Sequence, residues 1–294
     1  MIGRTNVAVP GGASSNASVA ISGTIGRTNS LTGGKGPPVF TYTGAYTLID
    51  DGDDHWRIKF TTSGTLNISK LNGARKIDAF LVGGGGSGRR SANKVTAGGG
   101  GGGGGYYTLA SAVKLSKNTN YEIVIGDGGA NTMAVGTNGY TGEDTTAFGY
   151  TAAGGEGGAT RAGGAGGATG GNGGYGTTTS TLKGLPGEDG SYEFNDTTST
   201  SRYNGGGGGG AGYYYTYNGT SSTVLVGAYG AGGEGGGGRG GKRGTSASST
   251  GPGTSGTANT GGGGGGTGGP SALYNMNYKP GAGGSGICIV RDAQ

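Results

Sequence analysis

The acidic residues are the first candidates for chemistry in this chain, because carboxylates bind metals and act as general acids and bases. The segment Asp50–Asp54 holds four aspartates around Gly52 and precedes the only histidine, His55. A calcium loop of the EF-hand type needs twelve residues and a closing glutamate, which this segment lacks. Asp and Gly are standard turn residues, so the segment predicts a hairpin turn. We therefore expect no metal site and no cofactor.

The patterns that could support catalysis are also incomplete. Acidic pairs occur at 143–144 and 188–189, but a glycosidase needs two carboxylates inside a walled cleft, and loops on a glycine scaffold offer little wall. Nothing in the spacing positions His55 for Ser–His–Asp catalysis. Gly83–Arg90 has the spacing of a phosphate-binding loop, but arginines stand where Lys and Ser or Thr are required. We expect no enzyme and no catalytic residues.

The tyrosines offer a different chemistry, which is noncovalent recognition. A tyrosine ring buries a large area, keeps a hydroxyl for hydrogen bonding and freezes only two side-chain torsions on binding. Aromatic clusters occupy 213–217 and 274–278, with a looser group at 192–203. The candidate binding residues are Tyr213, Tyr214, Tyr215, Tyr217, Tyr274, Met276, Tyr278, Tyr192, Phe194 and Tyr203. The alternative is that these aromatics cap the ends of a scaffold or pair with one another.

Glycine runs are the elements that must hold these residues in place. They occupy 83–88, 98–105, 126–129, 154–176, 205–212, 227–244, 261–269 and 281–286. Collagen needs glycine at every third position and abundant proline, and this chain has 82 Gly but only 7 Pro, so collagen is excluded. The longest runs repeat two glycines and one other residue. Because a polyproline-II helix has three residues per turn, these substituents lie on one edge and leave two edges bare for close packing.

The energetics require the runs to act together. Ordering a glycine costs about 1–2 kcal/mol, whereas one hydrogen bond returns about 0.5–1.5 kcal/mol. An isolated run is therefore expected to be disordered, while a bundle that satisfies both backbone groups would roughly break even. A run of about nine residues extends about 28 Å at ~3.1 Å per residue. We predict a stalk or slab of polyglycine-II helices with loops at its ends.

The segments outside the runs predict β-strands. Trp56, Ile58 and Phe60 alternate with polar residues, which is the period of a strand with one buried face. Phe80–Val82 enters the first glycine run and Ile287–Arg291 leaves the last one, so we predict that both belong to one β layer. The expected fold class is all-β plus a polyglycine-II helical bundle, with a small β-sandwich-like layer, distal loops and no α-helix.

Three units are expected along the chain: an N-terminal attachment or partner-docking segment at 1–38, a β-strand region at 39–82, and a polyglycine-rich domain with interleaved strands and recognition loops at 83–294. Within the first unit, Ile2–Asn6 recurs as Ile25–Asn29. Two similar strands could dock on equivalent sites of a partner. A locally duplicated leader explains the repeat equally well.

The direction of each run decides which loops lie at the exposed end. If the runs alternate and the last one returns to the β layer, loops 270–280, 213–229, 130–153 and 89–97 share the distal end. If 145–152 is instead a strand of the β layer, the parity changes and loop 177–204 becomes distal. Both assignments are consistent with the sequence.

Charge and composition exclude other classes. The net charge is +5, but apart from 89–90 and 242–243 the Lys and Arg residues are scattered along the sequence, whereas a nucleic-acid surface clusters them. We expect no nucleic acid. No apolar run approaches the ~18 residues of a membrane span, so we expect no membrane insertion. The N-terminus lacks the apolar region of a signal peptide. The single Cys288 excludes an intrachain disulfide framework and predicts a buried strand residue.

Phe80–Gly88, the Gly-Gly-X runs and the closing Gly283–Val290 resemble glycine-rich phage tail-fibre tip proteins, in particular the adhesin at the tip of T-even-like long tail fibres. The resemblance covers about residues 77–291. It implies polyglycine helices packed as a sandwich, with end loops that bind a bacterial surface receptor. The glycine-rich extracellular domain of anaplastic lymphoma kinase receptors is also similar, but it comes with disulfides and a signal peptide that this sequence lacks.

The resemblance leads us to expect a receptor-binding protein or adhesin of a phage or phage-like tail. Its partners would be a host cell-surface protein or glycan and, through residues 1–76, other tail or fibre proteins. Its location would be the virion, at the tail fibre or tail tip, and extracellular after host lysis. The alternatives are a structural virion component, such as a fibre, spike or baseplate decoration, and an ice-binding protein with a flat Thr-lined face.

Overall fold

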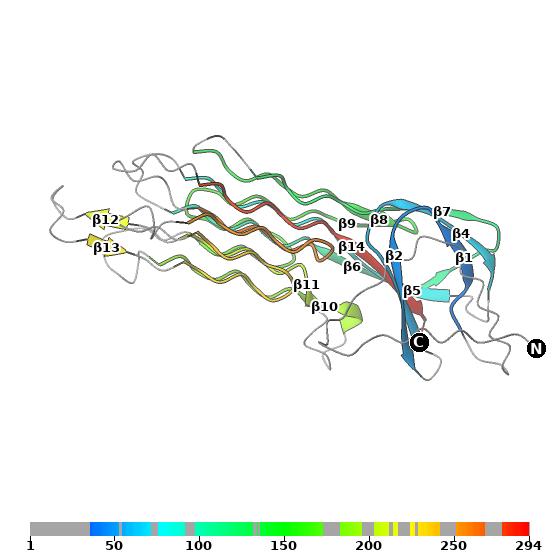
Figure 1. Ribbon diagram of the computed structural model, residues 1–294. Helices are drawn as coiled ribbons and strands as arrows, with labels where there is room; N and C mark the ends of the chain where they lie inside the picture. Colours follow the sequence, from blue (N-terminus) through cyan, green and yellow to red (C-terminus); the bar gives the residue numbers. More distant parts are fainter. Residues whose placement is uncertain are drawn as a thin grey trace, which may run out of the picture.

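Figure 1 shows two parts arranged end to end, a pair of β-sheets and a long stack of extended runs that projects from them. The computed structural model describes residues 36–52, 55–71, 76–91, 98–131, 134, 136–172, 183–195, 203–211, 214–216, 224–226, 229–241, 251–267 and 278–293. Most of the predicted attachment segment at 1–38, including both copies of its repeat, lies outside them.

The first sheet has five antiparallel strands in the order β2-β3-β14-β5-β6. The strands are β2 (Tyr46–Gly52), β3 (His55–Phe60), β14 (Ile287–Asp292), β5 (Lys76–Val82) and β6 (Tyr107–Lys114). The last strand of the chain, β14, lies in the centre, with Ile287 opposite Val82 and Cys288 opposite Phe60. This confirms that the strand entering the first glycine run and the strand leaving the last one share a β layer.

The second sheet has five antiparallel strands in the order β1-β4-β7-β8-β9. The strands are β1 (Val39–Tyr42), β4 (Gly64–Lys70), β7 (Asn120–Val124), β8 (Thr145–Ala147) and β9 (Tyr150–Ala152). Both sheets thus combine strands from 39–82 with strands from later parts of the chain. The described residues contain no α-helix, in agreement with the expected fold class.

The main hydrophobic core lies between the two sheets. Phe60 and Leu81 of the first sheet and Ile68 and Ile123 of the second are fully buried and belong to one cluster. Burying a side chain of this size contributes about 1.5–3 kcal/mol. The alternation predicted around Phe60 is confirmed, because the apolar residues of β3 enter this core.

The opposite face of the first sheet is also covered. Phe80 and Ile289 point into a smaller buried cluster that contains Phe194. Phe194 belongs to the 3-10 turn η1 (Glu193–Asn195), which follows β10 (Ser191–Tyr192) and precedes β11 (Tyr203–Asn204). A sheet covered on both faces needs near-continuous apolar strands. This explains why β5 and β14 lack the alternation seen in β3.

Cys288 provides a test of the central position of β14. The thiol is fully buried, and burial raises its pKa above the ordinary value. We expect no reaction with the thiol reagent DTNB at pH 8 in the native protein and complete reaction in guanidinium chloride, because the thiolate is the reactive form. Rapid labelling of the folded protein would contradict the placement of β14 inside the sheet.

The extended runs form the second part, which we call the glycine slab. It comprises residues 83–91, 98–105, 126–131, 138–144, 153–172, 183–190, 205–211, 229–241, 251–267 and 278–286. In Figure 1 these runs lie side by side along the long axis of the molecule. None of them contains a helix or a strand of a sheet.

The hydrogen bonds of run 98–105 repeat every third residue. Successive N–H groups donate in turn to runs 153–159, 168–172 and 261–267, at N···O distances of 2.8–3.1 Å. The donor–acceptor pairs are Gly100–Ala159, Gly103–Glu156, Gly101–Gly171, Gly104–Ala168, Gly102–Gly264 and Gly105–Gly261. A period of three residues is that of a polyproline-II helix, whose backbone groups all point outward. The predicted polyglycine-II arrangement is confirmed.

The carbonyl groups of run 98–105 accept from three further runs, 83–91, 162–167 and 205–211. This run therefore has six hydrogen-bonded neighbours, as in a hexagonal array of rods. Runs 83–91, 98–105, 205–211 and 261–267, which we call the inner runs, are buried along their whole length. Their backbone hydrogen bonds replace the hydrophobic core that the composition cannot supply.

The outer runs have the Gly-Gly-X pattern, and the structure explains it. In the run that begins at Ala153, the larger residues Ala153 and Glu156 are exposed, whereas Gly154 and Gly155 between them are buried. The substituents therefore lie on the one edge that faces solvent, as the triplet spacing predicts. Consecutive glycines mark an inner run, and a larger residue at every third position marks an outer run.

Candidate functional site

The far end of the slab, remote from the sheets, displays part of the predicted tyrosine clusters. Run 205–211 leads there, and β12 (Tyr214–Thr216) pairs with β13 (Val224–Val226) as an antiparallel hairpin at that end (Figure 1). Tyr214 and Tyr215 thus belong to a far-end hairpin. Tyr278 precedes Gly281, whose carbonyl accepts from the N–H of Gly88, and is half-buried at the same end. Tyr213, Tyr217, Tyr274 and Met276 lie outside the described residues.

The other predicted aromatics lie beside the sheets. Tyr192 and Tyr203 pair with each other across β10 and β11. Phe194 is buried, and its ring centroid lies 5.8 Å from that of Phe80. The guanidinium carbon of Arg291 lies 4.2 Å from the ring centroid of Phe194. Phe194 therefore packs into the covering of the first sheet. These three aromatics therefore lie apart from the far end of the slab.

The number of passes through the slab differs from the one expected from the sequence. Residues 145–152 do form strands of the β layer, which was the condition for placing 177–204 at the far end. That consequence is wrong for residues 191–195, which lie next to the sheets. The reason is that the chain makes additional passes through the slab: 126–144 runs outward and returns, and 153–172 crosses three times. Only the three-dimensional path reveals these reversals.

Arg89 organises one part of the far end. Its Nε donates to Asn138 Oδ1 at 3.1 Å and its Nη2 donates to the carbonyl of Gly136 at 2.9 Å. The N–H of Gly136 in turn donates to the carbonyl of Arg90. Burial lowers the pKa of Arg89, but an arginine keeps its charge in proteins. Two buried cations thus end this inner run, since Arg90 is also buried.

A second arginine contact lies on the outer runs. Arg239 Nη1 donates to the hydroxyl of Tyr229 at 3.3 Å, and its guanidinium carbon lies 5.3 Å from the centroid of that ring. Both residues are part of the slab, so the tyrosine ring and the cation are held against each other at the far end. Such pairs contribute about 0.5–1 kcal/mol at exposed sites.

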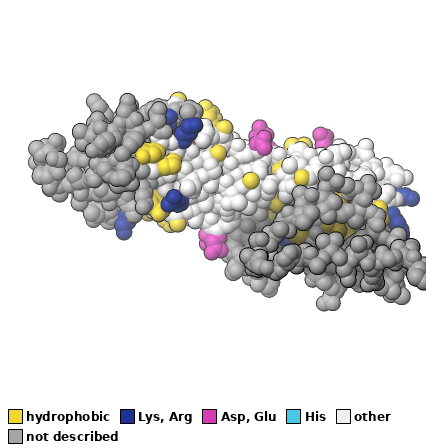
Figure 2. Space-filling view, viewed as in Figure 1, with side chains coloured by type: hydrophobic (Ala, Val, Ile, Leu, Met, Phe, Trp, Pro, Cys, Tyr) yellow, Lys and Arg dark blue, Asp and Glu magenta, His cyan; other side chains and the backbone are white. Residues whose placement is uncertain are grey.

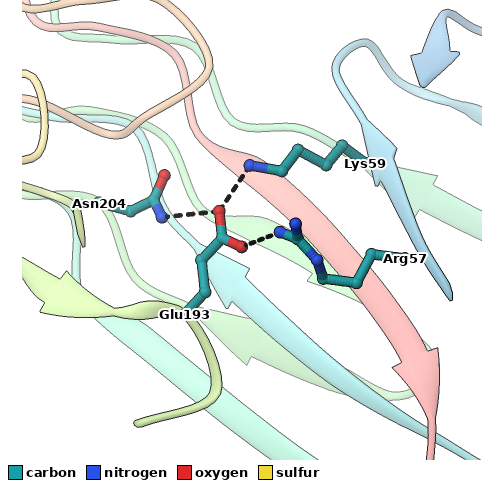
Figure 3. Close-up of polar contacts among 4 residues, drawn as sticks. All are labelled: Arg57, Lys59, Glu193 and Asn204. Atoms are coloured by element: carbon teal, nitrogen blue, oxygen red, sulfur yellow. Dashed lines mark hydrogen bonds and ion pairs between the residues drawn. The ribbon is translucent and has the colours of Figure 1, made fainter. Parts of the chain in front are cut away.

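A buried cluster of polar side chains, which the sequence did not reveal, connects the start of run 205–211 to the first sheet (Figure 3). It consists of Arg57, Lys59, Glu193 and Asn204. Glu193, which is 1% exposed, accepts from Arg57 Nη1 at 2.6 Å and from Lys59 Nζ at 2.5 Å. Asn204 Nδ2, at the start of run 205–211, lies 3.5 Å from the same carboxylate. The spacing of Arg57 and Lys59 places both on one face of β3, but only the fold brings Glu193 to them. Both oxygens of the Glu193 carboxylate accept hydrogen bonds from residues of β3, so the cluster is suited to holding η1 against the first sheet.

The remaining acidic candidates also support the backbone. Asp144 Oδ1 accepts from the N–H of Gly154 at 3.0 Å, and Glu188 Oε2 accepts from the N–H of Thr169 at 3.0 Å. The hydrogen bond from Thr169 lowers the pKa of Glu188. Asp189 Oδ1 accepts from the N–H of Glu234 at 2.8 Å. These carboxylates thus accept hydrogen bonds from backbone N–H groups of the slab, as the carbonyl groups of a neighbouring run do elsewhere.

The Asp50–Asp54 segment connects β2 and β3 as a hairpin, with Asp50 opposite Trp56 and Gly52 opposite His55. The hairpin prediction is confirmed, although residues 53–54 lie outside the described part. Among the described residues, no group of three or more His, Cys, Asp or Glu is arranged to hold a metal ion. In that same part of the chain, no helix is long and apolar enough to cross a membrane.

Comparison with known proteins identifies the architecture at the level of a family. A family model described as "Glycine-rich domain" matches residues 61–292, which is most of the chain. The chain belongs to the glycine-rich domain family. The match begins after β3 and ends at the last residue of β14. Strands β1, β2 and β3 therefore lie outside the matched region, although they belong to the two sheets. No curated protein matches the sequence.

Proposed function

We propose that this glycine-rich domain protein is the receptor-binding tip, or adhesin, of a phage or phage-like tail fibre. It would present far-end tyrosines to a protein or glycan on the host cell surface. The observation that carries this proposal is the placement of the β12–β13 hairpin and Tyr278 at the end of a rigid slab, remote from the sheets.

The architecture supports a display role. The inner runs are cross-linked by backbone hydrogen bonds on all sides, so the scaffold holds its far-end segments in fixed relative positions without depending on their side chains. Recognition loops on a rigid support are a recurrent arrangement in binding proteins.

The opposite end is the proposed attachment site. Residues 36–52 and 55–71 belong to the sheet end, and the chain that precedes them would reach other tail or fibre proteins from there. The protein would then be located in the virion and, after lysis, outside the host cell. We propose binding rather than catalysis, since the acidic residues Asp144, Glu188 and Asp189 are engaged by backbone N–H groups.

The test is an exchange of far-end segments. Replacing 213–229 and 270–280 together with the corresponding segments of a related protein is expected to change which host strain binds the particle, while particle assembly is unaffected. Adsorption to a panel of host strains measures the effect. Unchanged host binding combined with failed assembly would show instead that these segments contact neighbouring subunits in a structural virion component.

The matched control exchanges the segment 196–202. Its flanking residues Glu193 and Asn204 lie beside the sheets, so this exchange is expected to leave host choice unchanged. A change of host after the control exchange alone would place recognition at the sheet end and contradict the proposal.

A further inference from the structure

The fold concentrates positive charge that looks scattered in the sequence. Arg89 and Arg90 end an inner run at the far end, and Thr160, next to Arg161, bridges to Gly99 at the same level. Lys279 precedes Gly281, which accepts from Gly88. The described basic residues at this end are Arg89, Arg90, Arg161, Lys183, Arg239 and Lys279. The net charge of the whole chain is +5, and six of its cations lie together at this end.

The acidic residues lie toward the sheets. The backbone carbonyl of Glu156 accepts from the N–H of Gly103, and that of Glu188 accepts from the N–H of Gly207. The other described Asp and Glu residues lie at that level of the slab or nearer to the sheets. The sequence segments 88–99 and 235–282 contain no Asp or Glu at all. Figure 2 shows basic side chains on the left part of the slab and acidic ones nearer its middle, with further basic side chains at the sheet end on the right.

The distance along the slab between the basic far end and the level of the acidic residues is comparable to the Debye length. Gly100, which bonds to Arg89, and Gly103, which bonds to Glu156, are three residues apart on one run, and three polyproline-II residues span about 9 Å. The Debye length at physiological ionic strength is about 8 Å. The backbone levels of Arg89 and Glu156 are thus separated by about one Debye length, so the acidic residues offset the positive charge of this end only in part.

We propose that the far end binds an anionic polysaccharide, that is, a glycan bearing carboxylate or phosphate groups. This inference rests on the proposed receptor-binding function and specifies its ligand class. Arg161, Lys183, Arg239 and Lys279 are all exposed and lie on separate passes of the slab, so they form a dispersed set of charges around the end. Cations spaced in this way can pair with the negative groups that recur along a branched or flexible glycan.

The neighbouring tyrosines favour a glycan over a nucleic acid. Tyr229 and Tyr278 are both half-buried; the ring of Tyr229 lies against Arg239, and Tyr278 precedes Lys279 in the chain. Tyrosine combines an apolar face for a sugar ring with a hydroxyl for its oxygens. A nucleic-acid site would instead align its cations as a stripe or groove that follows the phosphate backbone.

The experiment measures binding of the full chain to immobilised polygalacturonate, neutral dextran and a double-stranded DNA oligomer by biolayer interferometry. We expect binding to polygalacturonate, none to dextran, and loss of binding as NaCl rises from 50 to 500 mM. The triple variant Lys183→Gln, Arg239→Gln and Lys279→Gln is expected to weaken polygalacturonate binding by about tenfold or more. Equal binding to dextran, or tighter binding to DNA, would overturn the proposal.

The matched control variant is Lys70→Gln, Lys76→Gln and Lys114→Gln, which removes the same charge from exposed positions on the sheets. It is expected to bind polygalacturonate like the parent protein. A loss equal to that of the far-end variant would show that net charge alone is responsible and would refute a far-end site. Thermal unfolding of both variants confirms that each is folded.

The two proposals fail separately. If the segment exchange changes host choice but the far-end charge variant binds polygalacturonate unchanged, the ligand class is wrong and the receptor-binding function stands. If polygalacturonate binding follows the far-end charges but the segment exchange leaves host choice unaltered, the charged site is real and the receptor-binding function is wrong.

Discussion

Replacing Gly102 with alanine is expected to destabilise the protein by about 3 kcal/mol or more, an unusually large effect for adding one methyl group. A Cβ at this position would lie 2.1 Å from the carbonyl oxygen of Gly86. That oxygen cannot move aside cheaply, because it accepts a hydrogen bond from the N–H of Gly264 at 2.8 Å. The clash is between backbones, so no change of side-chain rotamer can relieve it. Urea or thermal unfolding measures the loss, and the labelling rate of Cys288 reports it independently.

The matched control is Gly251→Ala. No atom lies within 4 Å of a Cβ at Gly251, and its backbone conformation is one that alanine can adopt. The expected change is within about 0.5 kcal/mol. Equal stability of the Gly102 and Gly251 variants would disprove close packing of the inner runs, since the two substitutions differ only in the space around the added methyl group.

Replacing Glu193 with alanine is expected to cost about 3–5 kcal/mol, because it leaves Arg57 and Lys59 without their shared carboxylate. The side chains of Arg57 and Lys59 are only 9% and 27% exposed, so water compensates poorly for the lost acceptor. The first sheet and the start of run 205–211 would lose a common anchor. Chemical denaturation measures the loss, and polygalacturonate binding by the surviving folded fraction should be unchanged.

Two further variants make this result specific. Glu156→Ala removes an exposed carboxylate from an outer run and is expected to change stability by less than about 0.5 kcal/mol. The triple replacement of Arg57, Lys59 and Glu193 by Met, Met and Leu is expected to recover most of the lost stability, since no unpaired charge remains buried. If Glu193→Ala is as stable as Glu156→Ala, the cluster does not hold the slab to the sheet.

The expected effects at Gly102 and Glu193 have the same origin, because the sheets and the slab stabilise the fold in different ways. The sheets supply the hydrophobic burial that the glycine slab lacks, and the runs that leave and return to them are held in register by their ends. Within the slab, each added residue makes two backbone hydrogen bonds that only roughly offset its ordering cost. Stability therefore depends on the packing of every inner run and on the connections between slab and sheets.

The local conformation could be predicted from the sequence. Triplet spacing such as that around Glu156 fixes a helix of three residues per turn, because side chains must all fall on the edge that faces solvent. The strands at Phe80–Val82 and Ile287–Arg291 could be assigned to one layer, because each adjoins an end of the glycine region. These features depend on the periodicity of neighbouring residues, which can be read directly from the chain.

The residues at each end of the slab could not be predicted from the sequence and are known from the fold alone. The partners of a polyglycine run are distant in sequence and carry no side chains that could identify them, so neither the number of passes nor their direction could be derived. The placement of Phe194 in the core, the contacts of Glu193 and the gathering of Arg161, Lys183, Arg239 and Lys279 at the far end all depend on that path. Charges that are separated along the chain form one electrostatic feature because the runs on which they lie turn at the same level.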